Sequence, residues 1–154
     1  MLPMHFLLAY PTCRTLLRIF AVGVLATMLC AAFAAPPRGH PLLGAWTFVV
    51  PNTDCTETYR FRSDGTSLVT SGEEVAESTF EVAAGPSPAG FYRWEDTITK
   101  DNLKKDCSGA ISEIGHSSTN YIRFNPDREM MIICRKESVD ECVGPLKRLH
   151  GQDS

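Results

Sequence analysis

The sequence predicts an all-β fold, an antiparallel up-and-down meander of about eight or nine short strands with two disulfides. After residue 34, every patterned stretch has a period near two, because the side chains of a strand alternate between its faces. Glycine, proline, asparagine or aspartate separates these stretches about every ten residues, which is typical of strands joined by short turns. Four cysteines lie in the same part of the chain.

Residues 1–34 have the pattern of a signal peptide. Arg14 and Arg18 precede a long uncharged run, and no acidic residue occurs in this segment. The run ends in Ala-Phe-Ala, which places alanine at the two positions that a signal peptidase inspects. We therefore expect cleavage near Ala34 and Ala35 and a periplasmic or secreted protein.

A retained membrane anchor is the alternative for this leader. The uncharged run of about 17 residues lies at the lower limit for crossing a bilayer. Pro36 and Pro37 follow it and favour cleavage. Contact with a membrane is thus expected only through the leader, if it is not cleaved.

The remaining segment, residues 35–154, is expected to form one mildly acidic domain. It holds 13 lysines and arginines against 18 aspartates and glutamates. Nucleic-acid binding requires clustered cations, and here only Lys104 and Lys105 are adjacent lysines. This class of partner is therefore excluded.

Two disulfides are expected among the four cysteines of this segment, because an even number in an exported chain indicates pairing. Three pairings are possible. Cys134 and Cys142 bracket seven residues that resemble a hairpin tip, which leaves Cys55 with Cys107. Zinc is the alternative, but the close C-x-x-C pairs typical of structural zinc sites do not occur.

The first two strands are expected at 45–50 and 56–62. Pro51 ends the first strand. In the second, Tyr59 and Phe61 alternate with polar residues and are expected to point inward. The charged residues expected on its outer face are Glu57, Arg60 and Arg62.

The next strands are expected at 67–71 and 73–82. The preceding turn, 63–66, contains a glycine, which tolerates the positive φ of a tight reversal. Residues 73–82 would also suit a helix, but Phe80 and Val82 favour a strand. A loop is expected at 83–90 from its composition alone.

The second half repeats this alternation. Residues 91–100 place Tyr92 and Trp94 on one face, and a polar loop is expected at 101–109. The other expected strands are 110–114, 119–125, 130–136 and 142–149. A bulge or an edge position would accommodate Pro145 in the last of them. Short local connections favour a barrel over a sandwich.

Three short motifs resemble those of the lipocalins. Residues 43–46 are similar to the G-x-W signature of the first lipocalin strand, and 119–121 to a later T-D-Y element. The resemblance implies a small lipocalin-like barrel over residues 35–154. It also implies that Trp46 closes one end of the barrel and that Arg148 packs over its ring, as a cation–π pair.

No group of residues predicts catalysis, and we expect neither an enzyme nor a cofactor or metal. His40, His116 and His150 lack a nucleophile or carboxylate arranged around them by sequence. A G-x-S-x-G elbow is also missing.

The expected function is the binding of a small apolar ligand inside the barrel. The aromatic residues expected to line it are Tyr59, Phe61, Phe80, Tyr92, Trp94 and Tyr121. Whether side chains fill this interior or leave a pocket stays open. The alternative function is a protein-interaction module, such as an inhibitor or immunity-type partner of an exported enzyme, with contacts through 83–90 or 101–109.

Overall fold

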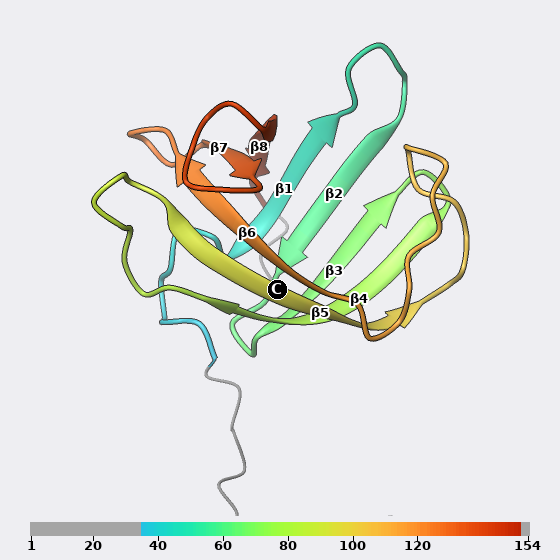
Figure 1. Cartoon of the computed structure of the whole chain (residues 1–154), viewed down its shortest axis with the longest axis horizontal. Helices are drawn as coiled ribbons and strands as arrows, with labels where there is room; N and C mark the ends of the chain where they lie inside the picture. The colour runs from blue at the N-terminus through green and yellow to red at the C-terminus, as the bar shows by residue number, and fades with distance from the viewer. Residues whose placement is uncertain (1–34, 152–154) are drawn as a thin grey trace, which may run out of the picture. The chain divides into compact units, whose positions relative to one another are not determined.

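Eight antiparallel strands form a closed barrel in the computed structural model, which describes residues 35–151 (Figure 1). Each strand pairs with its neighbours in sequence, and the last pairs with the first. The strands are β1 (Gly44–Val49), β2 (Thr56–Phe61), β3 (Thr66–Ser71), β4 (Glu74–Val82), β5 (Tyr92–Asp101), β6 (Ser117–Phe124), β7 (Met130–Cys134) and β8 (Cys142–Leu149). The prediction of an all-β meander is confirmed.

The expected leader, residues 1–34, lies outside the described residues. Within 35–151 there is no helix with the length and apolar character needed to cross a membrane.

Both expected disulfides are confirmed. Cys134 bonds to Cys142 across the register pair that ends β7 and begins β8. Cys55 bonds to Cys107 over a sequence separation of 52 residues. The chain-entropy model assigns about 2.5 kcal/mol of stabilisation to the short loop and about 4 kcal/mol to the long one.

The prediction of a strand at 110–114 is wrong. These residues belong to a single loop, 102–116, which joins β5 to β6 and which we call the strap. The carboxylate of Asp106 accepts hydrogen bonds from the backbone N–H groups of Ser108 and Ala110. Local hydrogen bonds of this kind compete with those of a strand ladder. Residues 110–114 therefore do not join the sheet.

Pro145 lies in a bulge, one of its two expected positions. Leu146 pairs with Met131 and Val143 with Ile133, so that two residues of β8 lie opposite one residue of β7. A bulge leaves a residue outside the ladder, where the missing N–H of proline costs little.

The hydrophobic core fills one half of the barrel. Its buried members are Leu42, Trp46, Phe48, Phe61, Phe80, Trp94, Ile122, Met131 and Leu146. Phe61 contacts the rings of Phe80 and Trp94 edge to face, at centroid distances of 5.2 and 5.3 Å. Such aromatic pairs add about 1 kcal/mol each beyond the area they bury.

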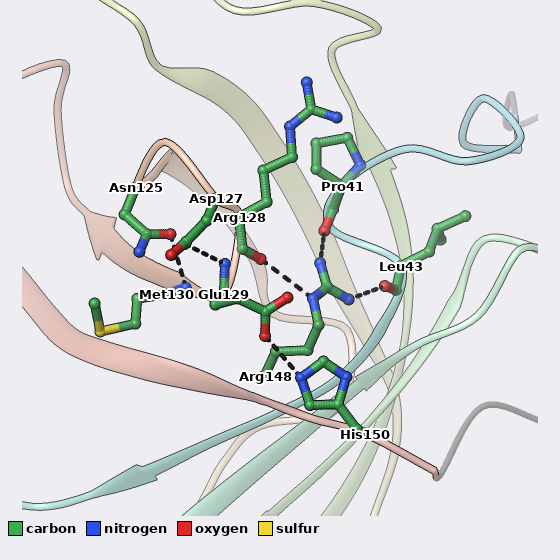
Figure 2. A network of polar contacts seen from close by, with 9 residues as sticks. All are labelled: Pro41, Leu43, Asn125, Asp127, Arg128, Glu129, Met130, Arg148 and His150. Carbon is green, nitrogen blue, oxygen red and sulfur yellow. Dashed lines mark hydrogen bonds and ion pairs between the residues drawn. The ribbon is translucent and has the colours of Figure 1, made fainter.

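Trp46 and Arg148 close this end of the barrel. The Arg148 guanidinium lies 4.2 Å from the centroid of the Trp46 ring, and these residues pair across β1 and β8. The guanidinium donates hydrogen bonds to the backbone oxygens of Pro41, Leu43 and Arg128 (Figure 2). One side chain therefore joins the N-terminal segment, the β6–β7 turn and the last strand.

Replacing Arg148 tests this closure. Arg148→Ala should lower the free energy of unfolding by about 3 kcal/mol, because three carbonyls lose a donor and the ring loses its cation. Arg148→Lys should recover only part of this, since an ammonium lacks the planar fork. Urea unfolding measures both. The control is Lys147→Ala on the exposed face of β8, and an equal loss in that variant would contradict the prediction.

Candidate functional site

The open end of the barrel holds a hollow whose walls include the core residues Phe48 and Trp94. This end carries the strap and the turns at 50–55, 72–73 and 135–141. The cavity measures about 480 Å³, within the range of roughly 300–1,000 Å³ for small-molecule pockets. Its lining consists of Phe48, Val50, Pro51, Glu57, Tyr59, Trp94, Cys107, Ser108, Asn120, Ile133, Cys142, Val143 and Gly144.

The six aromatic residues expected in the lining lie at four different places, and Tyr121 is the one outside the barrel. Tyr59 and Trp94 line the cavity. Phe61 and Phe80 belong to the packed core beneath it. Tyr92 lies near the closed end, with its ring 5.1 Å from that of the buried His40. The interior is therefore filled in one half of the barrel and hollow in the other.

Tyr121 lies on the outer face of β6, which corrects its expected inward position. It pairs with the exposed Arg93 on β5, whereas the next pair joins Asn120 to the buried Trp94. Residues opposite each other in a ladder share a face, and neighbours along a strand do not. Asn120 therefore takes the inward position at this level of the barrel.

Glu57 points into the barrel, although its position was expected to be outward. It pairs with the buried Phe48 and Ser71, so it shares the face of Tyr59. The Tyr59 hydroxyl donates to Glu57 Oε2 at 2.6 Å, and Ser71 Oγ donates to Oε1 at 2.8 Å. The period of two already contained this signal, because Glu57 precedes Tyr59 by two residues.

The phenol of Tyr59 is held in its neutral form. Burial raises its pKa, and the negative charge of Glu57 and the hydrogen bond to it raise the pKa further. Tyr59 thus remains a donor at every physiological pH, and it orients the Glu57 carboxylate inside the cavity.

Trp94 contributes an unused hydrogen-bond donor. Its side chain is 5% exposed and lines the cavity, and its Nε1–H has no partner among residues 35–151. A buried donor without a partner costs about 1–3 kcal/mol.

The strap covers part of the mouth and is anchored to it. The disulfide ties Cys107 to Cys55, and the Cys107 N–H donates to Ser71 Oγ at 3.0 Å. Glu73 donates its N–H to the Lys105 oxygen at 3.1 Å. The turn glycine Gly72 has a φ of 59°, and a Cβ there would lie 3.3 Å from the strap backbone. The close contact therefore requires glycine.

A second group of carboxylates lies at the same end of the barrel. Burial raises the pKa of Glu74, a hydrogen bond from Ser112 opposes this, and the charges of Asp101 and Asp106 raise the pKa further. Within the described part of the chain, no cluster of three histidine, cysteine or acidic side chains has a geometry that could hold a metal ion.

Comparison of the chain with known protein families, curated proteins and solved structures finds no match.

The raised pKa of Glu74 predicts a pH dependence of stability. The folded protein holds the Glu74 proton more tightly than the unfolded chain does. The stability that this proton contributes is therefore complete below pH 4.5, the ordinary pKa of the group, and is lost as pH rises through the pKa of the folded state. Glu74→Gln should therefore be more stable than the wild type at pH 7 and no more stable at about pH 4. Thermal unfolding at both pH values measures this, and a gain that is equal at both would contradict it.

Removal of the Cys55–Cys107 disulfide should release the strap. The double variant Cys55→Ser/Cys107→Ser should lose about 4 kcal/mol of unfolding free energy. Trypsin should also cut it faster at the exposed Lys104 and Lys105. The matched control, Cys134→Ser/Cys142→Ser, should lose about 2.5 kcal/mol without faster cleavage in the strap. Equal cleavage rates in the two variants would refute the tethering role.

Proposed function

We propose that the protein is an exported, lipocalin-like binding protein that holds a small ligand with an apolar body in the barrel mouth. The cavity of about 480 Å³ is the observation that carries this proposal. Its walls include Phe48, Val50, Ile133 and Val143, which favour apolar groups. Two disulfides suit an oxidising compartment, in agreement with the signal-peptide pattern of the leader.

The closed end supports kinship with the lipocalins. Trp46 is fully buried, and Arg148 lies over its ring. This is the arrangement that the G-x-W resemblance implies. The barrel is packed at this end and hollow at the other, which suits the binding of a ligand that enters through the mouth.

Filling the cavity should abolish binding. Val143 lines it and is 48% exposed, so Val143→Trp can place a ring in the mouth without overpacking the core. The wild type should enhance the fluorescence of the neutral probe N-phenylnaphthylamine at stoichiometric concentration, and Val143→Trp should not. The control is Val75→Trp, on an outward position of β4 with 43% exposure. A wild type that takes up no probe would overturn the proposal.

A protein-interaction module is the second candidate, and the strap favours it. Leu103, Ile111 and Ile114 on the strap are 62%, 55% and 53% exposed. Apolar side chains gathered on one exposed segment are typical of contact surfaces. Loop 83–90, the other expected contact segment, lies at the opposite end of the barrel (Figure 1). A specific partner that the Val143→Trp variant still binds would favour this function over ligand binding.

A further inference from the structure

The cavity contains one ionisable carboxylate and no positive side chain to match it. Glu57 is the only acidic residue of the lining, and no lysine, arginine or histidine of the described chain lines the cavity. The two donors to its oxygens, Tyr59 and Ser71, are both neutral hydroxyls. Glu57 is half-buried, and a carboxylate in such a place is stabilised most by a cation with which it can form a charge-assisted hydrogen bond.

The surroundings of the mouth add to this negative potential. The charges of Glu57, Glu74 and Asp106 all act on the Tyr59 phenol and raise its pKa. Lys104 and Lys105, the strap cations, are exposed to solvent. An anionic ligand, such as a fatty acid, would therefore enter a field of its own sign.

The walls next to Glu57 are suited to a cation with an apolar tail. Tyr59 and Trp94 present aromatic side chains to the cavity, and ring faces attract ammonium groups. Phe48, Val50 and Ile133 continue the wall as an apolar surface.

We propose that the ligand is an amphipathic organic amine, with its ammonium group on the Glu57 carboxylate and its apolar tail against Phe48, Val50 and Ile133. This inference rests on the proposed function and specifies the ligand class. Glu57 selects the headgroup by charge, and the apolar wall contributes affinity without regard to charge. Ser108 on the strap and Val143 on β8 are exposed members of the lining, and the ligand enters between them.

Calorimetric titration with three probes of equal chain length tests this proposal. Octylamine, octanol and octanoate each contain eight carbons, and their headgroups are cationic, neutral and anionic. Octylamine should bind the wild type at least about tenfold more tightly than octanol, and octanoate should bind most weakly. Added salt should weaken the binding of octylamine and leave that of octanol unchanged.

A variant that removes the charge of Glu57 tests whether this residue causes the preference for the amine. Glu57→Gln keeps one oxygen that can accept from the Tyr59 hydroxyl, and its amide NH2 can donate to Ser71 Oγ. This variant should lower octylamine affinity about tenfold while leaving octanol affinity unchanged. The matched control is Glu81→Gln, an equal charge change on the outer face of β4. It should leave both affinities at their wild-type values. Thermal unfolding of both variants verifies that they are folded.

The outcomes separate this inference from the function on which it rests. Octanol binding that equals octylamine binding, or a Glu57→Gln variant that keeps the preference for the amine, would overturn the inference and leave the binding function in place. Octylamine binding that persists in Val143→Trp would also overturn it, because the amine would then bind outside the cavity. Failure of all three probes and of N-phenylnaphthylamine would remove the binding function itself.

Discussion

The pairing of β1 with β8 is the contact on which the rest of the structure depends. Only three residue pairs join these strands, and Trp46 with Arg148 is the central one. Their pairing turns an open meander into a barrel, which removes the exposed edges that would otherwise promote association. The guanidinium adds bonds to Pro41 and Leu43, so the segment before β1 becomes the floor. A cavity at the other end can stay open because this end is sealed.

The two ends of the barrel differ because the inward residues differ. Large aromatic and aliphatic side chains fill the half near the floor. Toward the mouth the inward positions of β3 and β4 hold small or polar residues, among them Ser71, Glu74 and Ala76. Side chains of this size leave space, and their polar groups need partners. Glu57 obtains two of them from Tyr59 and Ser71, and the tethered strap gives Ser71 Oγ a second hydrogen bond through the Cys107 N–H.

Alternation along the chain predicted most of the barrel interior correctly and failed at two positions. The period of two identifies which residues share a face, but the inward face of each strand must be inferred from hydrophobicity. That inference succeeded at Trp94, where the apolar face is clear. It failed at Tyr121, because Asn120 occupies the inward side of β6, and at Glu57, because a charged residue was assumed to face solvent. Both exceptions lie at the level of the cavity.

The resemblance to the lipocalins implied the pair of residues that closes the floor. The sequence by itself determined the all-β class and the up-and-down order of the strands, and it favoured the two disulfide pairings that form. These depend on local alternation, turn residues and the spacing of cysteines, which a chain carries without reference to its fold. Only the tertiary structure decided that 102–116 is a strap over the mouth and that Glu57 faces a hollow without a matching cation. The reason is physical: a cavity is the volume that distant strands leave unfilled, and no local pattern records it.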